Sequence, residues 1–254
     1  MKSYQGYLID LDGTMYRGEE KIDAASRFVK RLEQQKLPYL FVTNNSSRTP
    51  KEVADKLVSM DIPATEKHVF TTSMATAQYI DQSYGKANVY MIGEQGLEEA
   101  LKNQGLQLNE KEIDVVVMGI DRSINYEKLS RACLAVRNGA AFLSTNGDVA
   151  IPTERGLLPG NGSLTSVVHV STGVEPTFIG KPESVIVDQA LEVLGTKLEE
   201  TVMVGDNYQT DILAGIRANM DTIIVHTGVT SEEQLKNEEI QPTWSIQSLD
   251  EWKI

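Results

Sequence analysis

The chain has 254 residues, enough for one large domain or two smaller ones, and 41% hydrophobic with 24% charged residues is ordinary for a globular protein. Its formal net charge of −12 argues against broad nucleic-acid binding, which needs a basic surface. No apolar run approaches the ~20 residues of a membrane span, so we expect no membrane anchor. Cys133 is the single cysteine, so we expect no internal disulfide. Because no secretory signal precedes Asp10 either, we expect a cytoplasmic protein.

Short apolar runs alternate with helical patterns along most of the chain, which predicts an α/β fold with a parallel sheet. The expected strands cover residues 6–9, 38–42, 88–92, 114–118, 141–144, 177–179, 201–204 and 222–225. The expected helices begin near Asp23, Pro50, Ser73, Glu94, Tyr126, Asn161, Pro182 and Tyr208. Thr49 before Pro50, and Asn125 before Tyr126, are residues typical of helix N-caps.

The first expected strand leads into Asp10-Leu11-Asp12-Gly13-Thr14. Two carboxylates two residues apart can point to the same side of a strand end, and the glycine lets the backbone approach a ligand closely. Like charges this close repel each other, and a divalent cation would relieve the repulsion. Mg²⁺ is typically bound by one or two carboxylates with phosphate oxygens, so this stretch predicts phosphoryl chemistry. A loop made of common turn residues is the alternative.

Polar residues follow three later strands. Thr43-Asn44-Asn45-Ser46 can donate hydroxyl and amide hydrogens to a phosphoryl oxygen, or can form only an asparagine-rich turn. Lys181, before a helix expected to start at Pro182, could neutralise a phosphoryl group and a carboxylate, although most lysines are solvated. Asp206 could complete a metal site, and Asp211 could meet Lys181 or a metal-bound water. For Asp211, stabilisation of a helix N-terminus is the alternative.

In chain order, the motifs D-x-D-G-T, T-N-N-S, G-K-P and G-D-x4-D resemble the haloacid dehalogenase-like (HAD) phosphohydrolase superfamily. The segment between the second and third motifs resembles an inserted C2-type cap, and its α/β pattern is similar to subclass IIA, the NagD-like group. The resemblance implies a Rossmann-like parallel-sheet core in residues 1–83 and 175–254, with an α/β cap domain in residues 84–174. It extends through Phe70–Ser73, Ser144–Asp148 and Gly156–Ser163, and so over nearly the whole chain.

The resemblance implies a Mg²⁺-dependent phosphatase, a phosphoric monoester hydrolase, that acts through an aspartyl-phosphate. Asp10 would be the nucleophile. Asp12 would protonate the leaving oxygen and then deprotonate the attacking water. The side chains of Asp10 and Asp206 and the backbone carbonyl of Asp12 would hold Mg²⁺. The residues that would bind the phosphoryl group or support the metal loop are Thr43, Asn44, Lys181, Asn207 and Thr210. Asp211 would support these residues from the next layer outward.

Cap residues would exclude water and contact the leaving group. The candidates in polar loops are Asn146, Asp148, Glu154 and Arg155, although solvated loop residues have the same appearance. The partner would be a small phosphorylated metabolite: a sugar phosphate, a phosphorylated acid, a nucleoside monophosphate or pyridoxal phosphate. A homodimer is compatible with the sequence. The nearby Gly160-Asn161-Gly162 lacks the rest of a nucleotide-binding G-x-G-x-x-G and is better explained as a helix start.

Two other functions compete with hydrolysis. A phosphotransferase or mutase of the same fold would pass the phosphoryl group to a second substrate, and phosphate release without an acceptor distinguishes it. A receiver-like phospho-switch also uses acidic residues, Thr or Ser and a Lys around Mg²⁺, but it is usually near half this length and has no inserted cap. A Ser-His-Asp hydrolase is disfavoured because G-x-S-x-G is absent from the sequence.

Overall fold

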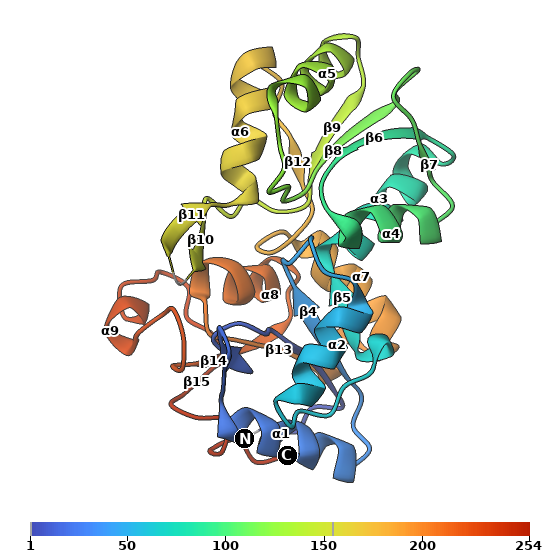
Figure 1. Ribbon diagram of the computed structural model, residues 1–254. Helices are drawn as coiled ribbons and strands as arrows, with labels where there is room; N and C mark the ends of the chain where they lie inside the picture. Colours follow the sequence, from blue (N-terminus) through green and yellow to red (C-terminus); the bar gives the residue numbers. More distant parts are fainter. Residues whose placement is uncertain (1, 154) are drawn as a thin grey trace. The chain divides into compact units, whose positions relative to one another are not determined.

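The computed structural model describes residues 2–153 and 155–254 and divides into two compact units (Figure 1). The first unit comprises residues up to Thr43 together with Pro50–Phe70 and Lys181–Ile254. The second unit comprises Asn44–Thr49 and Thr71–Gly180. It therefore contains the expected insertion, residues 84–174, along with flanking segments and the short stretch from 44 to 49.

The first unit is built on a six-stranded sheet with the strand order β15-β14-β13-β1-β4-β5. The strands are β1 Gly6–Ile9, β4 Tyr39–Thr43, β5 Val69–Thr71, β13 Thr201–Gly205, β14 Asp221–Val225 and β15 Trp244–Ile246. β1 pairs in parallel with β4 and β13, and β14 pairs in parallel with β13 and β15. Every residue of β1, β4 and β13 is buried, as expected for a sheet covered on both faces.

The helices of the first unit are α1 Asp23–Gln34, α2 Pro50–Ser59, α7 Ser184–Leu194, α8 Leu213–Arg217 and α9 Glu232–Leu235. α1 illustrates how sequence determines such a helix. Phe28, Val29 and Leu32 lie on one face and are fully buried, while an acidic residue in the first turn and a basic one in the last complement the helix dipole. The helix ends before Lys36, whose φ of 57° is incompatible with a right-handed helix.

The second unit has a parallel sheet with the order β12-β9-β8-β6-β7. Its strands are β6 Asn88–Ile92, β7 Gln107–Leu108, β8 Val115–Met118, β9 Ala141–Ser144 and β12 Thr177–Phe178, and β10 Ala150–Thr153 with β11 Gly156–Pro159 forms an antiparallel hairpin. The helices are α3 Thr72–Tyr84, α4 Gln95–Asn103, α5 Tyr126–Arg137 and α6 Asn161–Thr172. Alternate residues of β8 enter two separate cores, one shared with α3 and α4 and the other with α5 and α6. The two helix pairs lie on opposite sides of this sheet (Figure 1).

The expected α/β fold with a parallel sheet is confirmed, and each expected strand is present within a residue or two. The Asn125 side chain caps α5 by accepting from the backbone N–H of Lys128 at 3.0 Å. The expected helix start at Pro182 is wrong: α7 begins at Ser184 with Glu183 at its N-cap, and Pro182 follows a cis peptide bond. In the described part of the chain, no helix combines the length and the apolar character needed to cross a membrane.

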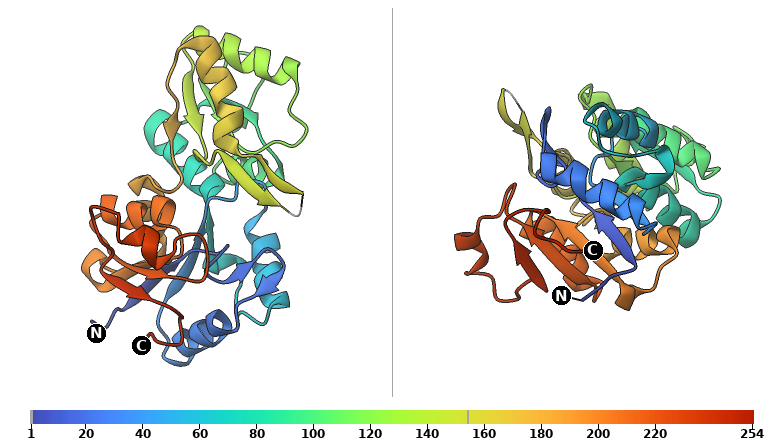
Figure 2. Two further views of the ribbon diagram at one scale, coloured as in Figure 1. Left: turned by 90° about the vertical axis from the view of Figure 1, so that its left-hand side faces the viewer. Right: turned by 90° about the horizontal axis from the view of Figure 1, so that it is seen from below.

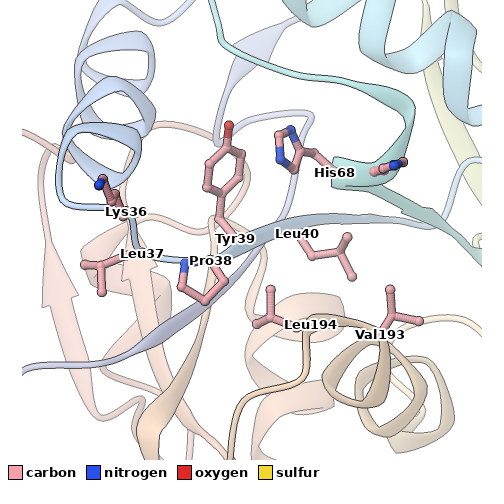
Figure 3. Close-up of a pocket in the computed structure, with 9 residues that line it drawn as sticks. Lys36, Leu37, Pro38, Tyr39, Leu40, His68, Val193 and Leu194 are labelled. Carbon is pink, nitrogen blue, oxygen red and sulfur yellow. The ribbon is translucent and has the colours of Figure 1, made fainter.

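A cavity of about 290 Å³ lies at the amino end of β4 (Figure 3). It is lined by residues 36–40, 67–68 and 193–194, and the ring centroids of Tyr39 and His68, two of these residues, lie 4.6 Å apart. β4 ends at Thr43, so this cavity lies at the other edge of the sheet from the second sequence motif. It is therefore separate from the candidate active site.

The two ends of the chain lie side by side in the first unit (Figure 2). The rings of Tyr4 and Trp252 stack with centroids 6.0 Å apart, and Trp244 meets Trp252 edge to face at 5.7 Å. Tyr4 and Trp252 are both fully buried. The C-terminal residues thus close the core over β1.

We expect Trp252→Ala to lower the free energy of unfolding by about 3–5 kcal/mol, because the lost indole leaves a cavity beside Tyr4. Trp252→Phe keeps an aromatic ring there and should cost clearly less. Urea denaturation followed by circular dichroism measures both. A loss below about 1 kcal/mol for the alanine variant would contradict a core role for Trp252.

Candidate active site

The carboxyl ends of three parallel strands bring the motif residues of the first unit together. The last residue of β1 lies opposite Phe41 of β4 and Val204 of β13, so these strands end at one edge of the sheet. Asp10 directly follows β1, Thr43 is the last residue of β4, and Asp206 directly follows β13. This edge is where α/β proteins usually bind their ligands.

Lys181 lies at the centre of this edge with only 2% of its surface exposed. Its Nζ donates to Asp10 Oδ1 at 2.5 Å, to Asp211 Oδ1 at 2.7 Å and to the Val42 carbonyl oxygen at 2.9 Å. An ammonium group has three hydrogens, so it can donate to all three of these acceptors. The alternative of a solvated loop lysine is wrong, and the expected meeting of Asp211 with Lys181 is found.

The charges around Lys181 are strongly coupled. Burial by itself would lower the pKa of Lys181, but the negative charges of Asp10 and Asp211 outweigh burial and hold that pKa above its ordinary value. Burial and the charge of Asp211 raise the pKa of Asp10 well above its ordinary value, and Lys181 opposes them. Lys181 therefore offsets part of the rise in the pKa of Asp10.

Asp206 is fully buried and held from two directions. Its Oδ1 accepts from the Thr14 hydroxyl at 3.1 Å, and its Oδ2 accepts from the backbone N–H of Val229 at 2.7 Å. Burial and the charge of Asp211 raise the pKa of Asp206 to about 6, although both hydrogen bonds oppose the rise. Asp206 is thus an oriented carboxylate that another positive charge would stabilise further.

The donor set fits a hard divalent cation. In the described part of the chain, Asp10, Asp206 and Asp211 each offer one carboxylate oxygen, and these oxygens lie within 4.8 Å of one another. All-oxygen sites of this kind suit Mg²⁺. Asp10 and Asp206 are the carboxylates that the sequence assigned to the metal, and the structure places Asp211 beside them. The backbone carbonyl of Asp12 stays a predicted ligand.

Asp211 lies in a π-helical turn, Tyr208–Ile212, that follows β13. Its Oδ2 accepts from the backbone N–H of Asn207 at 3.1 Å, and its Oδ1 accepts from the Thr210 hydroxyl at 3.3 Å as well as from Lys181. The structure therefore brings Asn207 and Thr210 to Asp211, where they hold its carboxylate. Their two expected roles, contact with the substrate and support of the metal loop, stay predictions.

Asp12 differs from the buried carboxylates because its side chain is exposed. Gly13 after it has a φ of 94°, a conformation that side chains rarely tolerate. A Cβ at Gly13 would also lie 2.2 Å from Asp206 Oδ2. Glycine at this position thus allows the backbone of the first motif to pass directly over the Asp206 carboxylate.

A supporting segment that the sequence analysis missed follows β14. Besides Val229, which donates to Asp206, it contains Thr227, whose hydroxyl donates to the Gly13 carbonyl oxygen at 2.7 Å. A Cβ at Gly228 would lie 1.9 Å from Asp206 Oδ2. One signal in the sequence could have found this segment. Gly228 lies just beyond the carboxyl end of the predicted strand 222–225, and the motif residues also lie just beyond the carboxyl ends of predicted strands.

In the second unit the structure groups the expected residues Asn44, Asn146 and Asp148. The Asn44 Nδ2 donates to both Asp148 carboxylate oxygens at 3.3 Å, and the Asn146 Nδ2 donates to the Asn44 carbonyl oxygen at 2.8 Å. Arg155 is exposed in the turn of the β10–β11 hairpin, where its backbone N–H donates to Thr153 Oγ1 at 3.2 Å. Glu154 lies outside the described residues.

Comparison with known proteins identifies the family. Residues 7–107 match the family model described as haloacid dehalogenase-like hydrolase, and residues 178–252 match one described as HAD-hydrolase-like. The chain belongs to the haloacid dehalogenase-like hydrolase family. The family expected from the four motifs is therefore confirmed.

Relatives match over almost their entire length. The 5′-nucleotidase YutF of Bacillus subtilis is 66% identical over 252 residues, which are 99% of this chain and 98% of the relative. An acid sugar phosphatase of Staphylococcus epidermidis is 53% identical over 251 residues, 98% of this chain and 97% of the relative.

Two solved structures have the same fold throughout. A double mutant of the thermostable NPPase from Geobacillus stearothermophilus has a TM-score of 0.94 at 60% identity, with 100% of this chain and 99% of that chain covered. NagD from Escherichia coli K-12 has a TM-score of 0.94 at 30% identity, with 99% of both chains covered. The HAD-type fold, the NagD-like group and the class of phosphoric monoester hydrolases are thereby confirmed.

We expect Gly228→Ala to raise the Mg²⁺ concentration needed for half-maximal phosphatase activity by about tenfold or more, because the new Cβ displaces Asp206 Oδ2. Gly195→Ala is the control: it places a side chain at a φ of 75° but in open space beyond α7, so it should reduce stability without changing the metal requirement. Magnesium titrations of activity, with melting curves, measure both. An unchanged requirement in folded Gly228→Ala would contradict this account of Asp206.

Proposed function

We propose that this protein is a Mg²⁺-dependent phosphatase of small phosphate monoesters that forms an aspartyl-phosphate on Asp10. The observation that carries the proposal is the buried ammonium of Lys181, held between Asp10 and Asp211 in a cluster of three carboxylates. An anion oriented by a buried cation at a strand end is suited to attack a phosphoryl group, whose own charge the same cation offsets. Membership of the HAD-like family supports the assignment.

In the first step, an Asp10 carboxylate oxygen attacks phosphorus while the bond from phosphorus to the ester oxygen breaks. Lys181 binds Oδ1 of Asp10, and no hydrogen bond from the described residues reaches Oδ2, so Oδ2 is the attacking atom that we propose. Asp12 gives its proton to the departing oxygen. Its exposed side chain is accessible to a substrate, whereas the side chain of Asp10 is almost entirely buried.

In the second step, water attacks the phosphorus of the aspartyl-phosphate and Asp12 accepts a proton from that water. The bond between phosphorus and the Asp10 oxygen breaks, which releases inorganic phosphate and restores the Asp10 carboxylate. Asp12 is then protonated again, ready to serve the next leaving group.

The phosphoryl oxygens would be bound by Lys181, the Thr43 hydroxyl and Asn44, which follows Thr43 directly in the chain. The carboxylates of Asp10 and Asp206 and the carbonyl of Asp12 would hold Mg²⁺, which when bound would offset the negative charge of the phosphoryl group. Asp211 would keep Lys181 in place, and Asn207 and Thr210 would support Asp211.

For the substrate we propose sugar or acid-sugar phosphates, with nucleoside monophosphates as the second candidate. The relative from S. epidermidis is named an acid sugar phosphatase and the one from B. subtilis a 5′-nucleotidase, which supports both classes. Asn146, Asp148 and Arg155 of the second unit are the residues that we assign to leaving-group recognition, and Glu154 stays a candidate. A cytoplasmic location and a homodimer also remain predictions.

We expect release of phosphate from 4-nitrophenyl phosphate and from a panel of sugar phosphates and nucleoside monophosphates in Mg²⁺, and none in EDTA. Asp10→Asn should reduce turnover by about 10³-fold or more while the melting curve stays close to that of the wild type, because an amide cannot replace the nucleophile. Phosphate release is measured without any acceptor, and the rank order of kcat/KM over the panel distinguishes the two substrate classes. A long-lived phosphoprotein with negligible release, or transfer only to an added acceptor, would contradict hydrolysis.

Asp12→Asn should impair different substrates unequally. 4-Nitrophenolate departs without a proton, whereas a sugar alkoxide needs one, so we expect kcat for sugar phosphates to fall about tenfold or more further than kcat for 4-nitrophenyl phosphate. The two kcat ratios, measured with the same enzyme preparation, test this. Equal losses for both leaving groups would argue against Asp12 as the general acid.

A further inference from the structure

The first residue of α6, Asn161, makes an unusual set of contacts. The side chain is 1% exposed, and its Nδ2 lies within hydrogen-bond distance of four oxygens. These are Asn146 O at 3.0 Å, Ser144 Oγ at 3.0 Å, Thr145 Oγ1 at 3.1 Å and Met118 O at 3.2 Å. Its Oδ1 is buried and has no hydrogen-bond partner among the described residues. The orientation of the amide therefore gives its N–H groups acceptors and leaves its carbonyl oxygen without a hydrogen bond.

All but one of those oxygens belong to residues 144–149, the last residue of β9 and the loop that follows it. The same loop accepts from the backbone N–H groups of Gly160 and Gly162, through Val149 O at 2.8 Å and Asp148 O at 2.9 Å. The packing is close, because a Cβ at Gly160 would lie 2.1 Å from Asp148 O and one at Gly162 would lie 2.3 Å from Gly147 O. The start of α6 thus binds this loop at several points.

The loop in turn holds Asn44, which belongs to the motif Thr43–Ser46 that is predicted to bind a phosphoryl oxygen. Asn146 donates from Nδ2 to the Asn44 carbonyl oxygen at 2.8 Å and accepts at Oδ1 from the backbone N–H of Asp148 at 3.1 Å. Asp148 accepts from the Asn44 side chain. One chain of contacts therefore runs from Asn161 through Asn146 and Asp148 to Asn44, entirely within the second unit.

We propose that Asn161 is a positioning residue for phosphoryl binding, which sets the backbone and amide of Asn44 through the loop 144–149. The inference rests on the proposed function, in which Asn44 binds a phosphoryl oxygen. It gives the Gly160-Asn161-Gly162 sequence a role that a helix start alone does not explain. The two glycines permit the close approach, and the asparagine supplies the donors.

The probe is inorganic phosphate, titrated by calorimetry into the Mg²⁺-loaded enzyme. Phosphate has no leaving group, so its affinity does not depend on residues that recognise the rest of a substrate. We expect Asn161→Ala to weaken phosphate binding about ten- to hundredfold, because a small displacement of a binding group has effects of that size. Asn161→Asp should weaken it further, since it places a carboxylate oxygen against the oxygens of the loop.

A double-mutant cycle tests the route. Asn44→Ala alone should weaken phosphate binding, and Asn161→Ala should then add less than about threefold in the Asn44→Ala background, because residues that act through one another are not additive. Full additivity would overturn the inference, since a general loss of packing acts equally in both backgrounds. If Asn161→Ala binds phosphate with wild-type affinity while Asn44→Ala binds it more weakly, the inference about Asn161 is overturned but the proposed role of Asn44 stands. Wild-type affinity in Asn44→Ala would overturn the proposed role of Asn44 as well.

Two further variants keep the test decisive. Thr172→Val is the control: it removes a hydroxyl bond to Val168 O, at 2.8 Å, at the other end of α6, and it should leave phosphate affinity unchanged. If the Asn161 variants do not fold, Asn146→Ala removes the bond to the Asn44 carbonyl directly. It should weaken phosphate binding to the same extent. Wild-type affinity in folded Asn146→Ala would contradict the proposed action of Asn161 on Asn44 through the loop 144–149.

Discussion

The buried ammonium of Lys181 is the constraint on which the rest of the site depends. Removing a charge from water is costly unless opposite charges and hydrogen bonds replace the lost hydration, and here Asp10, Asp211 and a main-chain carbonyl do so. The three acceptors come from three separate segments of the chain. The cluster can therefore exist only when the parallel sheet has brought those segments to one edge. The charged cluster and the folded sheet thus form together.

The remaining parts of the site follow from the negative charge of that cluster. Three buried carboxylates share one lysine, and burial with mutual repulsion raises the pKa of Asp10 and of Asp206. A protein can maintain such a site only if its surroundings are rigid and rich in donors. Thr14, the backbone of Val229 and the close approach of Gly13 and Gly228 provide this around Asp206. In the second unit, glycines at the start of α6 allow a comparably close approach around the loop that holds Asn44.

Much of this could be predicted from the sequence, and the parts that could not have physical explanations. Strands such as β1 and β13 were predictable because buried, mostly apolar runs of four or five residues are distinctive, whereas β7 has only two residues and no periodicity to detect. The start of α7 was misplaced because proline at a first helical position and proline just before a helix have the same local sequence. No local sequence signal links Gly228 to Asp206, because Asp206 lies 22 positions earlier in the chain.

By itself, the sequence determined the strand ends, the residue types placed there and hence the family, because hydrophobic runs, turn residues and motif order are local properties. Only the tertiary structure decided that Lys181 is buried among acceptors from separate segments, that Asp211 joins the carboxylate cluster, and that Asn44 belongs with Asn146 and Asp148. These features depend on contacts between residues 30 to 171 positions apart. Such contacts are set by the packing of whole elements, which no short stretch of sequence encodes.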